Sequence, residues 1–156
     1  TNVNFCIVGH SERRQIFKEK DQDINLKSER LIANNVIPII CIGETLEQKE
    51  KGITNTVLEE QLMNSIPSSS TFENTIIAYE PVWAIGTGLT PTIKEIDETH
   101  RFIRDHNDKF NKYKILYGGS VKASNAKEIT DLASVDGALI GGASLKSEEF
   151  TKIIQD

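Results

Sequence analysis

The chain has 156 residues, of which 38% are hydrophobic and 26% charged, and this is about the size of one ordinary domain. No apolar run approaches the roughly 18 residues of a membrane span, so the sequence argues against a membrane protein. The net charge of −5 comes from 18 Lys and Arg against 23 Asp and Glu, interspersed without the basic stripe of a nucleic-acid-binding protein. We therefore expect neither a membrane nor nucleic acid as a partner.

Five short apolar runs alternate with longer helical patterns and predict strands. They are residues 4–8, 36–42, 75–79, 114–117 and 137–140. Their nearly continuous apolar character predicts burial on both faces, as in a parallel sheet covered by helices. Cys6 and Cys41 lie inside two of these runs, where a thiol packs as a small hydrophobic residue, and a reducing, cytoplasmic setting fits.

Helical periodicity fills the segments between the strands. Apolar or aromatic residues share one face in two of them: Ile53, Val57, Leu58, Leu62 and Met63, and then Ile93, Ile96, His100 and Ile103. Thr90 and Pro91 predict the N-cap and first residue of the second helix, and a last amphipathic helix is expected near residues 147–155. The pattern predicts a single α/β domain, either an open doubly wound sheet or a part of a β/α barrel.

Four polar or glycine-rich segments follow the predicted strands. They are residues 9–14, 78–88, 117–120 and 139–144. In both architectures the loops at the carboxyl ends of the strands converge on one crevice. The candidate functional residues are therefore expected in these segments.

His10 stands at the end of the first predicted strand and has two interpretations. One is a structural histidine that only makes hydrogen bonds within the fold. The other follows from Ser11 and Glu12, which are expected to begin a short helix whose N-terminal amides disfavour protonation of the imidazole. A neutral histidine of this kind can donate a hydrogen bond to a substrate.

Glu80 ends the third predicted strand and also has two interpretations. As a strand-terminal carboxylate it would pair with a cation, for example Arg13 or Arg14. Alternatively it is a base beside a lid, because it leads into the stiff segment 81–83 and then into a glycine-rich tip.

Paired glycines follow the last two predicted strands, at residues 118–119 and 141–142. In these two loops of a β/α barrel, backbone amides without side chains can form an anion nest, to which Ser120 would add a hydroxyl donor. The sequence has neither a Walker-type motif nor G-x-G-x-x-G, so a nucleotide site is not expected.

Together these segments resemble the motifs of the triosephosphate isomerase family, in the family's order and at similar spacing. The motifs are residues 9–14, 41–44, 78–88, 117–120 and 140–144. The resemblance covers essentially all of the chain and implies the fourth to eighth strands of a TIM (β/α)8 barrel. The implied fold is an incomplete barrel of five consecutive β/α units, a single domain of residues 1–156 that lacks the first three strands.

The resemblance also implies a role for individual residues. Glu80 would be the catalytic base and His10 the electrophile that polarises the substrate carbonyl. Gly86, Ser120, Gly141 and Gly142 would grip the substrate phosphate, Ser11 and Glu12 would support the histidine and an active-site lysine, and Pro81, Val82 and Trp83 would form the lid hinge. The implied reaction interconverts glyceraldehyde 3-phosphate and dihydroxyacetone phosphate in the cytoplasm, with a small triose phosphate as partner and without a metal or an organic cofactor.

The chain departs from the family in several places. The far hinge of the lid reads Leu-Thr-Pro-Thr at residues 89–92, which differs from the commonest family pattern. The first strand, which supplies an Asn and a Lys that contact substrate, has no counterpart, and neither has the third loop, which makes most of the usual homodimer interface. The chain begins with Thr1 rather than Met, so the true N-terminus is expected further upstream. An inactive fragment or remnant that keeps a phosphate site without catalysis stays open as the alternative.

Overall fold

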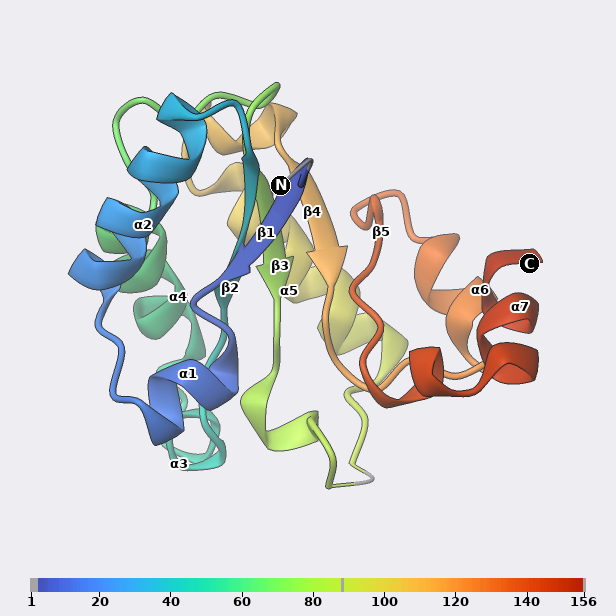
Figure 1. Ribbon diagram of the computed structural model, residues 1–156. Coiled ribbons are helices and arrows are strands. Elements are labelled where there is room, and N and C mark those ends of the chain that lie inside the picture. The colour runs from blue at the N-terminus through green and yellow to red at the C-terminus, as the bar shows by residue number, and fades with distance from the viewer. Residues whose placement is uncertain (1–2, 88, 156) are drawn as a thin grey trace.

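The computed structural model describes residues 3–87 and 89–155 and contains one sheet of five parallel strands (Figure 1). The strands are β1 (Phe5–Val8), β2 (Ile37–Ile42), β3 (Ile76–Tyr79), β4 (Lys114–Tyr117) and β5 (Gly137–Ala138). Each strand lies beside the next one in the sequence. A doubly wound sheet reverses its strand order at a switch point, and no reversal occurs along these five strands, so the barrel alternative is correct.

Helices follow each strand. They are α1 (Ser11–Ile16), α2 (Asp21–Ala33), α3 (Leu46–Glu50), α4 (Thr54–Ser65), α5 (Ile93–Asp105), α6 (Ala126–Thr130) and α7 (Ser147–Gln155). Three short 3-10 helices are η1 (Val82–Ala84), η2 (Phe110–Lys112) and η3 (Gly142–Leu145). Figure 1 shows α2 and α4 beside β1 and β2, and α6 and α7 on the side of β5. No helix in the described part of the chain combines the length and the apolar character needed to cross a bilayer.

The core lies between the sheet and the helices. The strand register aligns Val8, Ile40, Ile77 and Ile115 in one row across β1 to β4, and all four side chains are buried. Full burial of an aliphatic side chain of this size contributes about 1.5–3 kcal/mol to folding. This row therefore holds the first four strands in the arrangement that brings their carboxyl ends together.

The other face of the sheet is covered unevenly, so the prediction of burial on both faces is correct for only part of this second face. On this face Phe5 and Ile7 of β1 are 52% and 46% exposed, whereas Cys41 of β2 is fully buried. Ile39 of β2 and Ile76 of β3, which follow in the same row as Ile7, are half-buried. The apolar character of the strands thus exceeds what this five-stranded sheet covers.

The start of α5 differs from the prediction at Thr90 and Pro91. The Thr92 hydroxyl accepts a hydrogen bond from the Glu95 amide, and the Glu95 carboxylate accepts one from the Thr92 amide. This reciprocal capping box satisfies two free amides and starts the helix at Ile93. The predicted apolar face of α5 is confirmed, since Ile96, His100 and Ile103 are buried.

The predicted face of α4 is only partly correct. Val57, Leu58 and Leu62 are buried, whereas Met63 is 61% exposed. Ile53 is the N-cap residue and precedes the helix. Positions 57, 58 and 62 follow the spacing of one helical face, and position 63 lies beyond its edge.

Candidate active site

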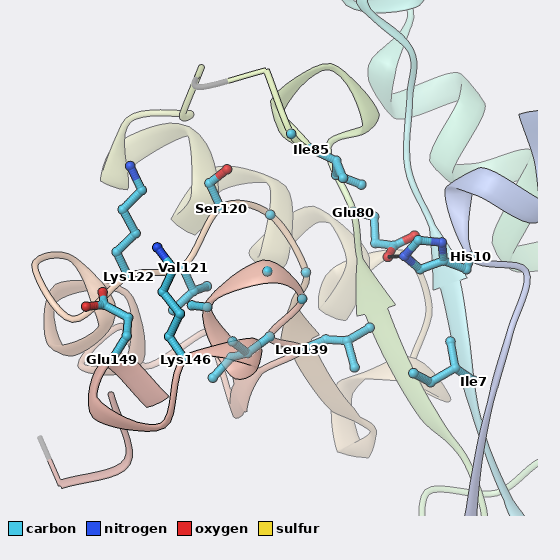
Figure 2. A pocket seen from close by; sticks show the side chains of 17 residues that line it. Ile7, His10, Glu80, Ile85, Ser120, Val121, Lys122, Leu139, Lys146 and Glu149 are labelled. Atoms are coloured by element: carbon cyan, nitrogen blue, oxygen red, sulfur yellow. Dashed lines mark ion pairs between the residues drawn. The ribbon is translucent and has the colours of Figure 1, made fainter. Parts of the chain in front are cut away.

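The carboxyl ends of the strands surround a cavity of about 570 Å³ (Figure 2). Six of the residues predicted to act in catalysis or phosphate binding line it: His10, Glu80, Gly86, Ser120, Gly141 and Gly142. They come from the loops after β1, β3, β4 and β5. The structure therefore brings together segments that are up to 132 residues apart in the sequence.

His10 is the N-cap residue of α1, and its imidazole is held by that helix. Its Nδ1 accepts a hydrogen bond from the Glu12 amide at 3.3 Å, as the sequence predicted from the position of the helix. A ring nitrogen that accepts a hydrogen bond carries no proton, so Nε2 is the ring nitrogen available to donate one. Nε2 lies 3.1 Å from Oε1 of Glu80, inside the cavity.

Glu80 directly follows β3 and is 2% exposed. Its Oε2 accepts a hydrogen bond from the Ser11 amide at 3.0 Å, and its Oε1 faces His10. Burial raises the pKa of the Glu80 carboxyl above its ordinary value, while His10 and the Ser11 amide act in the opposite direction. A carboxylate with a raised pKa is a stronger base than one in water.

The alternative in which Glu80 pairs with Arg13 or Arg14 is wrong. Arg13 forms an ion pair with Glu19, and Arg14 forms one with Asp21, each at 2.6 Å. Arg14 also donates to the backbone carbonyls of Gly9 and Cys41, at the carboxyl ends of β1 and β2. Arg14 thus fixes the spacing of the two strand ends beside Glu80. This role is evident only from the three-dimensional structure.

Gly43 is a further residue of the site that the analysis of individual residues missed. An ideal Cβ at this position would lie 1.7 Å from the backbone carbonyl oxygen of Glu80. Any side chain here would push the two loops apart, so only glycine allows this close approach. Gly43 belongs to the motif at residues 41–44, but the need for glycine there comes from its contact with Glu80, 37 positions away in the sequence.

The predicted phosphate loops form the opposite wall of the cavity from His10. An ideal Cβ on Gly141 or Gly142 would meet no atom within 4 Å, so both backbones face open space. Ser120 lies in the same wall and donates its hydroxyl to the carbonyl oxygen of Ala84 at 2.8 Å. This hydrogen bond joins the loop after β4 to the segment after β3 that carries Gly86.

The predicted lid hinge, Pro81, Val82 and Trp83, lies beside the cavity rather than in its wall. Val82 and Trp83 belong to η1, and the Trp83 indole donates to Oε1 of Glu44 at 2.7 Å. The Glu44 carboxyl is buried, and burial raises its pKa, whereas the Trp83 indole lowers it. The sequence did not predict this partner, although Glu44 stands in the quoted segment 41–44. Gly88, at the end of the predicted lid tip, lies outside the described residues.

Ser11 and Glu12 contact Glu80 and His10 through their backbone amides. The Ser11 amide bonds Glu80 and the Glu12 amide bonds His10, whereas the Glu12 side chain is exposed. Across residues 3–87 and 89–155 no group of three or more His, Cys, Asp or Glu side chains is arranged to hold a metal ion.

Comparison with known proteins gives a consistent result. Residues 1–156 match the sequence profile of the family described as Triosephosphate isomerase. The chain belongs to the triosephosphate isomerase family. It is 51% identical over 152 residues to the triosephosphate isomerase of Rhizobium meliloti, covering 94% of this chain and 59% of the relative. It is 48% identical to that of Mesomycoplasma hyorhinis, covering 98% and 62%.

A crystal structure of triosephosphate isomerase from Bartonella henselae has the same arrangement. Its TM-score is 0.90 at 42% identity, and the match covers 97% of this chain and 64% of that one. The chain thus spans about 60% of the length of the relatives it matches. The predicted fold, five consecutive units of a TIM (β/α)8 barrel, is confirmed.

Proposed function

We propose that these residues serve a triose-phosphate isomerase that interconverts glyceraldehyde 3-phosphate and dihydroxyacetone phosphate. Such an enzyme would work in glycolysis and gluconeogenesis, in the cytoplasm. The observation that carries the proposal is the facing pair of Glu80 and His10, 3.1 Å apart, in the same cavity as the Gly141 and Gly142 backbone. One end of this cavity suits proton transfer and the other suits a phosphate.

In the proposed mechanism Glu80 removes the proton from the carbon beside the substrate carbonyl. The electron pair of the broken C–H bond forms the C=C bond of an enediolate, and the carbonyl oxygen takes the negative charge. The Nε2–H of His10 donates a hydrogen bond to this oxygen and stabilises the charge. His10 gives its Nε2 proton to this oxygen and takes the proton of the neighbouring hydroxyl, so that a new carbonyl forms there as Glu80 returns a proton to the neighbouring carbon. The overall reaction needs no external oxidant or reductant.

The phosphate would lie against Ser120, Gly141, Gly142 and Gly86. At Gly141 and Gly142 no side chain or neighbouring atom lies on the Cβ side of the backbone, so an anion can approach closely, as it does in other backbone nests. The segment formed by Pro81, Val82 and Trp83 would act as a hinge, allowing the tip with Gly86 to close over the substrate and exclude water.

We further infer that residues 1–156 are the C-terminal portion of a barrel whose first three strands lie outside this chain. The test protein is therefore a completed barrel, meaning these 156 residues joined to the three preceding β/α units of the Bartonella henselae relative. Turnover of glyceraldehyde 3-phosphate by the completed barrel supports the proposal. Phosphate binding without any turnover would instead support the inactive remnant.

Replacing Gly141 with valine is expected to weaken binding of inorganic phosphate to the completed barrel roughly tenfold, or about 1.4 kcal/mol. The position opens onto the cavity, so the valine side chain fills the anion site without a clash inside the fold. Calorimetry with inorganic phosphate measures the effect, and Ala133→Val on an exposed turn is the control. Equal affinity in the two variants would remove Gly141 from the phosphate site.

An ordinary glutamate has a pKa of about 4.3. Because burial raises the pKa of Glu80, we expect Glu80 to become protonated at a higher pH than an ordinary glutamate. The base is active above this pKa, so turnover falls as the pH falls through it. The titration of Glu80 in the completed barrel is read from the ¹³C carboxyl signal that disappears in Glu80→Gln. A signal that titrates at or below pH 4.3 would contradict the expected direction.

A further inference from the structure

Two lysines that no motif singled out border the cavity. Lys122 follows Ser120 by two residues, and Lys146 is the C-cap residue of η3, the helix that begins at Gly142. Both side chains line the cavity, and both are exposed. Figure 2 shows both lysine side chains on the side of the cavity where Ser120 lies, away from Glu80 and His10.

Neither ammonium group is neutralised within the described residues. No carboxylate of residues 3–87 or 89–155 forms an ion pair with Lys122 or Lys146. Glu149 shares the wall, but its Oε1 accepts a hydrogen bond from the Ala123 amide at 2.8 Å. The carboxylate is thus held by the loop after β4 rather than by a lysine.

These lysines add positive charge to the part of the predicted phosphate grip that this chain supplies. The grip consists of backbone amides and one hydroxyl, all of them uncharged, and in the described part of the chain no other Lys or Arg lines the cavity. The whole chain carries a net charge of −5, which repels an anion at a distance. Local cations at the mouth of a cavity raise the local concentration of an anionic ligand and its rate of capture.

We propose that Lys122 and Lys146 form a cationic rim that captures the phosphate group of the substrate before the glycine loops bind it. The rim selects phosphorylated over neutral trioses at the encounter step. It acts on capture rather than on proton transfer, because Glu80 and His10 lie on the opposite wall. The choice of a triose phosphate rests on the proposed function, whereas capture of a divalent oxyanion does not.

The test is the double variant Lys122→Met and Lys146→Met in the completed barrel, which keeps most of the side-chain volume and removes both charges. At low ionic strength we expect kcat/KM for glyceraldehyde 3-phosphate to fall about 3- to 10-fold with kcat unchanged. The difference in kcat/KM between the parent and the double variant should shrink at roughly 0.5 M salt, because at that ionic strength the field of an exposed charge extends only a few Å. Lys152→Met, an exposed charge change on α7 outside the cavity wall, is the control.

Calorimetry with sulfate gives a second readout that does not depend on turnover. The double variant should bind this dianion about 3- to 10-fold more weakly at low ionic strength, and Glu149→Gln should bind it more tightly. If the parent barrel turns over no triose phosphate but loses sulfate affinity in the double variant, the proposed function fails and the rim stands. Unchanged sulfate affinity and an unchanged salt dependence of kcat/KM would overturn the rim, even in an active enzyme.

Discussion

Shortening Glu80 to aspartate in the completed barrel is expected to lower kcat about 100-fold. The change withdraws the carboxylate by one methylene, and a displacement of roughly this size at a reacting centre can cost two orders of magnitude. KM should change much less, because the loops proposed to bind phosphate are on the other wall of the cavity. Steady-state kinetics with glyceraldehyde 3-phosphate measures both constants.

The matched control for this variant is Glu98→Asp. It makes the same chemical change on the exposed surface of α5, where Glu98 pairs only with Lys94 four residues earlier. Normal kcat is expected in the control. A normal kcat in Glu80→Asp as well would remove Glu80 from the catalytic residues and leave its hydrogen bond to Ser11 as a structural contact.

The second large effect concerns the 156 residues by themselves, which we expect to be poorly folded or self-associated and to show no isomerase activity above background. Among residues 3–87 and 89–155, β1 and β5 each pair with a strand on one side only, and Phe5 and Ile7 of β1 are about half-exposed. Unpaired strand edges promote association with other chains. A few hundred Å² of exposed apolar surface at about 25 cal/mol per Å² is comparable to the whole stability of a domain, about 5–15 kcal/mol.

Hydrogen exchange, sedimentation and turnover of the isolated chain check this expectation together. We expect weak protection of the amides in β1 and β5 and a concentration-dependent sedimentation coefficient. The completed barrel is the reference for all three measurements. If the 156-residue chain is monomeric and active and its strand amides are protected from exchange, then neither barrel closure nor the first-strand lysine is required for folding and turnover.

The sequence predicted the strands well because each is a short apolar run with polar or glycine residues at its end. It predicted burial less well, since Phe5 and Ile7 look like core residues but have no covering layer in the described structure. Helix ends depended on details of hydrogen bonding: Thr90 and Pro91 are plausible start signals, yet the capping box formed by Thr92 decides the boundary. When two neighbouring residues could each cap a helix, the hydrogen-bond geometry of the folded chain decides which one does so.

The position of the proposed catalytic pair could be predicted from motifs, whereas the residues that hold the pair in place could not. The sequence placed His10 and Glu80 at strand ends, and parallel strands bring such ends together. It left Arg14 as a possible partner of Glu80, but Arg14 instead bridges two strand ends. Residues such as Gly43 act through contacts with distant parts of the chain, which a single sequence does not reveal.

The most direct test of the central claim, that Glu80 transfers a proton between two carbons of a triose phosphate, is isotope exchange. The completed barrel is incubated with dihydroxyacetone phosphate in D₂O, and the carbon beside the carbonyl is followed by ¹H NMR. A carboxyl group exchanges its proton with solvent, so the account predicts enzyme-dependent deuterium at this carbon and its loss in Glu80→Gln. Deuterium incorporation that persists at the parent rate in Glu80→Gln would contradict the account.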